Sequence, residues 1–324
     1  SEYIYSRNMI LRNGYPETRP GIQRLIGVDQ QLMDTTFWFG SKTEQSGFWF
    51  PFSFSNNPSI NNLDGYGSYR FDGMNNEESI IISDGRVLID IAGRYYSINT
   101  EESIVGETGI TFVSGNNEVL MLRGDGKSIM VWKKGSPSFV LLTGIEVPTA
   151  TFGLYAYNRF WLVNGSSLYA SNLLDSTSYS LIGQTFSFEP GDGEDISAIA
   201  KFKDDYLLVF KQTSTYVMSE INVPIELGKY LSNYAMIDVV DTNNGCANQH
   251  SVAVKGEQVY FLNNNGLTSI SRTTEGNMYG IDLVLSEPIK PLIDLINFDS
   301  NKSCISYFDN YILVCVPTNN NTEP

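Results

Sequence analysis

Residues 196–272 contain one pattern of strands and turns twice. Each copy has an apolar strand, a short turn, a second apolar strand, a polar turn and a third strand. The first turns fall at Asp204-Asp205 and at Lys255-Gly256. A meander that recurs along one chain is typical of repeat architectures, in which each unit buries its apolar surface against the next. The pattern predicts a β-propeller, a fold that serves mostly as a scaffold.

Similar apolar strands open further units along the chain. Starts at residues 79, 110, 151, 198, 251 and 304 give spacings of 31, 41, 47, 53 and 53 residues. Propeller blades occupy about 40–50 residues, so these intervals fit with some loop insertions. The second strand of each unit is apolar on both faces, as in YLLVF from Tyr206 and YILVCV from Tyr311, which indicates burial between neighbouring blades. We therefore expect an all-β protein, a propeller of about six or seven blades with an N-terminal extended arm.

Residues 1–76 differ from residues 77–324, which carry the predicted blades. The segment NGYPETRPGIQRLIG is rich in turn residues and follows Arg12, so we expect an extended arm over residues 1–24. Residues 25–76 set many aromatics in a Ser/Asn/Gly background and predict either a first blade or an insertion that contacts a partner. The last unit ends after two strands, so the chain is either a truncated form of a longer protein or is completed by a strand from Ser1 onward. One short helix is expected within a connection, with Ile289, Leu292, Ile293 and Ile296 on one face.

The chain carries 36 acidic and 21 basic residues, a formal charge of −15. This balance argues against a groove that holds nucleic acid by neutralising its phosphates, but is compatible with a passage through which nucleic acid slides. The sequence contains no run of about 18 apolar residues, so no transmembrane helix is expected. The first residues lack the basic-then-apolar layout of a signal peptide.

Three cysteines, Cys246, Cys304 and Cys315, are too few for a disulfide framework or a zinc site. Cys304 and Cys315 can face each other across a hairpin. Buried free thiols are the favoured interpretation, and they suit assembly in a reducing cytoplasm.

No catalytic constellation emerges from the motifs. His250 is the single histidine, and a surface or strand-edge position is favoured over a catalytic or metal-binding one. No nucleophile elbow, P-loop or dinucleotide fingerprint is present. Ser83-Asp84-Gly85 is the nearest fragment to the boxes of sialidase propellers, but the spacing is wrong.

Two features allow a binding site but have plainer explanations. Asp192, Glu194 and Asp195 have a spacing that suits calcium, yet a solvated connection between blades is favoured. The aromatic groups at 37–39, 48–50 and Phe186/Phe188 can stack on sugars, although aromatics in an all-β chain more often serve as core or interface anchors. We therefore expect no enzyme and no catalytic, cofactor-binding or metal-binding residue.

The order of segments from about 79 to 272 resembles the β-propeller tail proteins of short-tailed bacteriophages, the packaged-DNA stabilisation proteins or tail hub and accessory factors. An N-terminal Arg19-Pro20-Gly21 follows Tyr15-Pro16-Glu17, and GRVLIDIAGRYYSIN is similar to a strand pair of that family. The most specific match is a Phe/Trp strand, a Ser-x-Leu segment, an acidic loop and a Ser-Thr strand within 157–218. GCANQHSVAVKGEQVYFLNNNGLTSI follows the same order.

The resemblance implies a structural virion protein, assembled in the host bacterial cytoplasm and located in the tail. It implies a homo-oligomeric ring, commonly sixfold, below the portal and adaptor, which helps retain packaged DNA and supports fibres or spikes. Double-stranded DNA would pass an acidic inner surface without sequence-specific binding and with little adhesion. The alternative is a carbohydrate-binding or glycan-cleaving propeller, which would need aromatics and two carboxylates on one propeller face.

Overall fold

The structure is a computed structural model. It describes the backbone of four N-terminal strands and residues 64–321, apart from 84, 92–93, 125, 190, 204, 223–228, 257, 273–278, 282–284, 299–301, 309–310 and 320. The predicted arm over residues 1–24 and the aromatic groups at 37–39 and 48–50 lie in the part whose side chains are not described. Within that part, β1 (Met9–Arg12) pairs with β2 (Tyr15–Thr18), and β3 (Thr36–Phe39) pairs with β4 (Phe48–Pro51).

Residues 64–321 form successive antiparallel units. The first five units have four main strands each, and the sixth has two in the described residues. The first two units contain β5 (Gly65–Tyr69), β6 (Glu78–Ser83), β7 (Arg86–Ile91), β8 (Arg94–Thr100), β9 (Ile110–Gly115), β10 (Glu118–Leu122), β11 (Met130–Lys133) and β12 (Ser138–Leu141). The next two contain β13 (Phe152–Ala156), β14 (Arg159–Asn164), β15 (Ser167–Asn172), β16 (Asp175–Tyr179), β17 (Thr185–Ser187), β18 (Ala198–Phe202), β19 (Tyr206–Phe210), β20 (Thr215–Ser219) and β21 (Met236–Asp241). The last two contain β22 (Val252–Lys255), β23 (Gln258–Asn263), β24 (Gly266–Arg272), β25 (Tyr279–Ile281), β26 (Cys304–Phe308) and β27 (Tyr311–Cys315).

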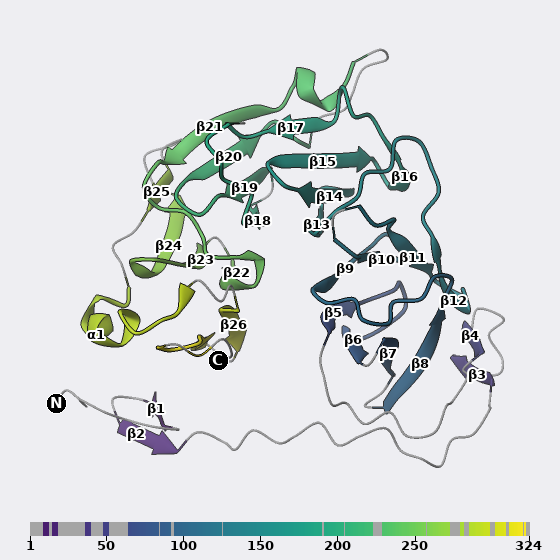
Figure 1. The fold of residues 1–324 in the computed structure, drawn as a ribbon, viewed down its shortest axis with the longest axis horizontal. Helices are drawn as coiled ribbons and strands as arrows, with labels where there is room; N and C mark the ends of the chain where they lie inside the picture. The colour runs from purple at the N-terminus through teal and green to yellow at the C-terminus, as the bar shows by residue number, and fades with distance from the viewer. Residues whose placement is uncertain are drawn as a thin grey trace.

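The units follow one another around an arc, with the first strand of each unit toward its centre and the fourth toward its rim (Figure 1). The first and sixth units stand at the two ends of this arc. Each four-stranded unit is a meander in which consecutive strands pair antiparallel. This is the architecture of a β-propeller, and it confirms the predicted fold class.

Apolar side chains fill the layers between neighbouring units. In unit four, Leu207 and Val209 join the cluster shared with unit three, whereas Leu208 and Phe210 join the cluster shared with unit five. Alternate residues of a strand point to opposite faces, so β19 is buried on both sides. Two-sided burial explains why the second strands of the units read as continuous apolar runs.

Units one and two are joined along both of their edges. β5 pairs with β9 in parallel on the inner side, and β8 pairs with β12 in parallel on the outer side. The inner pairing depends on glycine, because a Cβ at Gly67 would lie 2.6 Å from Cβ of Phe112, and one at Gly65 would lie 2.8 Å from the Ile110 carbonyl oxygen. The eight strands therefore enclose one apolar cluster.

The first unit begins earlier than the sequence predicts. Ser79 lies in β6, the second strand, and the first strand β5 begins at Gly65. Residues 65–69 therefore supply the first strand of the first unit. The sequence signal is weak here because GYGSY contains no aliphatic run. The predicted starts near 110, 151, 198, 251 and 304 are confirmed by β9, β13, β18, β22 and β26.

The expected short helix lies in the connection between units five and six. It consists of a 3-10 turn at Glu287–Ile289 and α1 (Lys290–Ile293). Its predicted apolar face is only partly buried, because Ile293 is buried whereas Ile289 and Leu292 are exposed. In the described residues, no helix is long and apolar enough to cross a membrane.

Candidate functional face

Two sets of loops gather on one face of the propeller. Because the strands of a unit alternate in direction, the turn between its second and third strands lies at the same end as the connections between units. We call this the connection face. The described acidic side chains of these loops are Glu101, Glu102, Glu107, Glu146, Glu189, Asp192, Glu194, Asp195, Glu287 and Asp294. The basic ones are Arg123, Lys127, Lys211, Lys290 and Lys302, so acidic residues outnumber basic ones on this face.

A polar residue recurs on the connection face where each second strand ends. At least three apolar residues precede it in every four-stranded unit, and the polar residues are Ser83, Arg123, Asn164, Lys211 and Asn263. From unit two onward, each side chain bonds to the connection that leads into its own unit. In units three and five these bonds join Asn164 Nδ2 to Thr149 Oγ1 at 2.9 Å and Asn263 Nδ2 to Asn244 Oδ1 at 3.2 Å. We call these contacts clasps.

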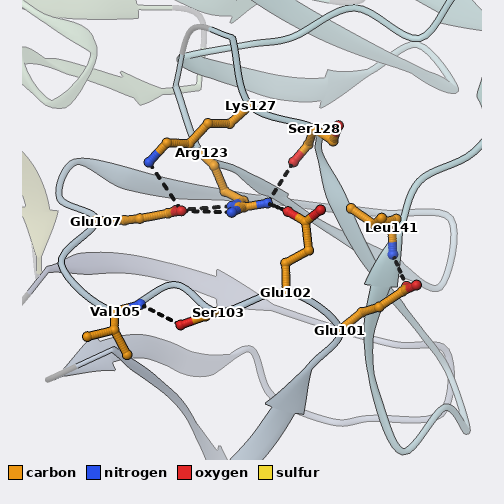
Figure 2. Close-up of polar contacts among 9 residues, drawn as sticks. All are labelled: Glu101, Glu102, Ser103, Val105, Glu107, Arg123, Lys127, Ser128 and Leu141. Carbon is orange, nitrogen blue, oxygen red and sulfur yellow. Dashed lines mark hydrogen bonds and ion pairs between the residues drawn. The ribbon is translucent and has the colours of Figure 1, made fainter.

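The clasp of unit two is a buried arginine between two glutamates (Figure 2). Arg123 donates from Nε and Nη2 to the carboxylate of Glu107, at 3.0 and 2.7 Å, and from Nη1 to Glu102 at 2.5 Å. Lys127 Nζ lies 3.1 Å from the same Glu107 carboxylate. This bidentate geometry, with several charge-assisted bonds, is the strong form of an ion pair. It ties the connection between units one and two to the turn after β10.

These contacts shift the titration of both partners. The hydrogen bond from Arg123 lowers the pKa of Glu107, and Lys127 lowers it further, although burial opposes both. The hydrogen bond to Glu107 raises the pKa of Arg123. The pair therefore stays ionised across the neutral range.

The clasp of unit four is a fully buried lysine. Nζ of Lys211 donates to Oδ2 of Asp192 at 2.5 Å and to the carbonyl oxygen of Glu189 at 3.2 Å. The hydrogen bond from Lys211 lowers the pKa of Asp192. In the same loop Glu194 accepts from the backbone N–H of Thr213 at 3.2 Å and from its hydroxyl at 3.0 Å.

The acidic loop thus has internal partners for two of its carboxylates. Among the residues that the structure describes, no group of three or more His, Cys, Asp or Glu side chains could hold a metal ion. In the chain the loop connects β17 of unit three to β18 of unit four.

The other residues singled out from the sequence lie apart from one another. His250 is exposed beside β22, and its backbone N–H donates to Oδ1 of Asn248 at 2.8 Å. Phe186 and Phe188 are buried, with their rings against Trp161 and Tyr216. Phe186 and Phe188 are core residues and offer no surface to a sugar.

The cysteines differ from the prediction. Cys246 is buried as expected, but Cys304 and Cys315 are exposed. They occupy directly opposite positions of β26 and β27, which confirms that they face each other across a hairpin. Their side chains are exposed because they project from the face of the β26–β27 hairpin that is turned away from unit five.

The clasps were not predicted from the sequence. Their partners lie 16 and 19 residues apart in units two and four, so only the register of the strands brings them together. A signal was available in the aligned units, because in each of the five four-stranded units a polar residue comes directly after the apolar run of the second strand.

No protein-family model matches the sequence, and no curated protein sequence matches it. Solved structures do match. The extracellular domain of BT4673 from B. thetaiotaomicron has 10% identity and a TM-score of 0.50, covering 90% of this chain and 38% of that one. YCF48 from Cyanidioschyzon merolae has 10% identity and a TM-score of 0.48, covering 80% of each chain. BamB from Moraxella catarrhalis has 13% identity and a TM-score of 0.41, covering 65% of this chain and 59% of that one.

These neighbours are β-propellers. The chain is a β-propeller. At these identities the likeness concerns the fold alone, because propellers carry many unrelated functions. The match covers 38% of the extracellular domain of BT4673 and 59% of the BamB chain, so activities of those whole proteins do not transfer to this chain.

Proposed function

We propose that this propeller is a structural protein of a phage tail, assembled as a ring below the portal and adaptor. It would help retain packaged DNA and give it a passage. The observation that carries the proposal is that buried charged side chains of the connection face form ion pairs between loops. The most buried of these side chains, Arg123 and Lys211, hold loops in place. Loops braced in this way suit a rigid scaffold that contacts protein neighbours.

The acidic excess of the same face supports the proposed passage for DNA. Carboxylates repel phosphates, so a duplex that slides past the face adheres weakly. The partners we propose are further copies of this chain, the portal and adaptor, and other tail proteins. The resemblance of the segment order over residues 79–272 to phage tail propellers also supports the proposal.

The decisive experiment is electron microscopy of particles that contain this protein. We expect a ring of the protein below one capsid vertex. Deletion of residues 1–24, the proposed contact with a neighbouring subunit or the adaptor, is expected to abolish ring incorporation while the isolated propeller stays folded. Normal particles from the truncated chain would contradict the role of the arm, and particles without any ring would overturn the tail assignment.

A binding measurement separates a passage from a DNA-binding site. The purified protein is expected to show no retention of a duplex at physiological ionic strength, and a basic variant is the control. Replacing Glu146, Asp195 and Glu287, which belong to no clasp, with Lys should create salt-dependent binding. Tight binding by the unaltered protein would contradict the proposed passage.

A further inference from the structure

The sixth unit exposes a pair of opposite thiols. Cys304 opens β26, Cys315 closes β27, and the two residues are register partners. We propose that Cys304 and Cys315 form a cross-strand dithiol site that is oxidised to a disulfide by exchange with a small-molecule disulfide. The inference concerns the chemistry of this unit and is independent of the proposed role in a tail.

The backbone brings the two sulfurs within bonding reach. Opposite residues of an antiparallel pair have Cα atoms roughly 4.5–5.5 Å apart. Protein disulfides span Cα separations of roughly 4.4–6.8 Å. Opposite side chains also project from the same face of the sheet, so Cys304 and Cys315 share one face. A disulfide would therefore form without a change of register.

The face that carries the thiols is the one turned away from unit five. On β26, Ile305 is buried and Nζ of Lys255, from unit five, lies 4.2 Å from the centre of the Tyr307 ring. Odd-numbered residues of β26 thus face unit five. Cys304 and Ser306 alternate with them and are exposed. A small reagent in solution can reach this face.

The proposed oxidation proceeds in two exchange steps. A thiolate from one cysteine attacks a sulfur of the small disulfide, whose S–S bond breaks and releases one small thiol after proton uptake. The second cysteine then loses its proton and attacks the protein-side sulfur of the mixed disulfide, which releases the second small thiol. The protein loses two protons and two electrons, and the small disulfide accepts them and is reduced to two thiols.

Although Cys304 is exposed as a residue, partial desolvation of its thiol raises its pKa, and the neighbouring Cys315 raises it further. A raised pKa keeps the thiol protonated at neutral pH, so exchange should accelerate as pH rises from 7 to 9.

The chain contains its own unreactive control. Cys246 is fully buried, and burial raises the pKa of its thiol to about 12. Its sulfur contacts the carbonyl oxygens of Asn248 and Ser251. A reagent that acts only on accessible thiolates should leave Cys246 unchanged while the protein is folded.

The test is mass spectrometry of the folded protein after incubation with oxidised glutathione at pH 8. The reaction is quenched with acid, and the denatured protein is alkylated with a maleimide. We expect the main product to have lost two hydrogen atoms and to carry a single maleimide, on Cys246. Chymotrypsin, which can cut after Tyr307, should then release peptides joined through Cys304 and Cys315. The mixed glutathione adduct should stay below about a tenth of the product, because the second thiol is at high effective concentration.

Three variants make the result specific. Cys304→Ser and Cys315→Ser should each stop at a mixed glutathione adduct, whereas the matched control Cys246→Ser should form the same disulfide as the unaltered protein. Accumulation of two glutathione adducts would show that the sulfurs cannot meet and would overturn the proposal. Complete lack of reaction at both thiols would overturn it as well, because the face would then be covered in solution.

Discussion

Units four and six place nearly the same strand in different surroundings. β19 has the sequence YLLVF and β27 has the sequence YILVC, and each is the second strand of its unit. Leu208 of β19 is fully buried, whereas the equivalent Leu313 of β27 is 42% exposed. The difference lies in the neighbours, because β19 has β20 beside it and a further unit on each side. An apolar second strand is therefore buried only where a neighbouring strand and neighbouring units pack against it, as in unit four and not in unit six.

The largest expected effect comes from truncating the two equivalent leucines. Leu208→Ala should lower the free energy of unfolding by about 2–5 kcal/mol, because it opens a cavity between units four and five. Leu313→Ala should cost less than about 1 kcal/mol, because its side chain already meets water. Denaturant unfolding followed by tryptophan fluorescence measures both. Equal losses would mean that β27 is covered in solution and would remove the contrast between the units.

The clasp residue gives a second contrast, because Val316 of unit six stands where unit four has Lys211. Asp192→Asn should lower the denaturation midpoint, since it strips the counter-charge from a fully buried ammonium group. Lys211→Met imitates the apolar residue of unit six and should cost less. In the double variant, the loss should be smaller than in Asp192→Asn alone. A double variant less stable than both single variants would show that the lysine does not depend on this partner.

Lowering the pH should weaken the clasps, because it protonates their carboxylates, and should leave the apolar contacts unchanged. The folded pKa of Glu107 lies below its ordinary value of 4.5, and that of Asp192 below its ordinary value of 3.8. A lowered folded pKa contributes stability above the unfolded pKa, and this contribution is lost as pH falls through the folded value. Stability should therefore decline below about pH 4.5, and Glu107→Gln should flatten that decline. Urea titrations between pH 3 and 7 provide the comparison, and an unchanged slope in Glu107→Gln would count against the clasp of unit two.

The smallest expected effect is at the contact between units five and six. Nζ of Lys255 lies over the ring of Tyr307, and a cation–π contact at an exposed site contributes about 0.5–1 kcal/mol. Lys255→Gln should lower the free energy of local unfolding of unit six by that amount, while Lys255→Arg should retain the contact. Hydrogen exchange at the β26 amides detects the change, and faster exchange in both variants would point to another cause.

The repeat of apolar strands was sufficient to predict the propeller. Turn residues helped, since Asn116 and Asn117 adopt positive φ values of 50° and 60° between β9 and β10. Strand β5 escaped detection because Gly65 and Gly67 replace the usual aliphatic residues where two units approach closely. Hydrophobic periodicity does not detect a strand in which glycine takes the positions where aliphatic residues are expected.

The face and its clasps were harder to foresee than the fold. In the sequence, Arg123 and Lys211 look like ordinary charged loop residues. Their contacts with the preceding connection depend on the strand register, which the local sequence does not give. The exposure of Cys304 and Cys315 was missed for a related reason. Their apolar neighbours predict burial, but burial depends on strands and units outside the local sequence.

The two parallel strand pairings between units one and two determine how the molecule should respond to a pulling force. A propeller blade with free edges can peel from its neighbour one strand at a time. β5 with β9 and β8 with β12 leave no such starting point between these two units, so both inter-unit seams must rupture before either unit separates. Among the described strands, β26 and β27 of the sixth unit pair only with each other. A pulling experiment should therefore unravel the sixth unit first and the joined pair last.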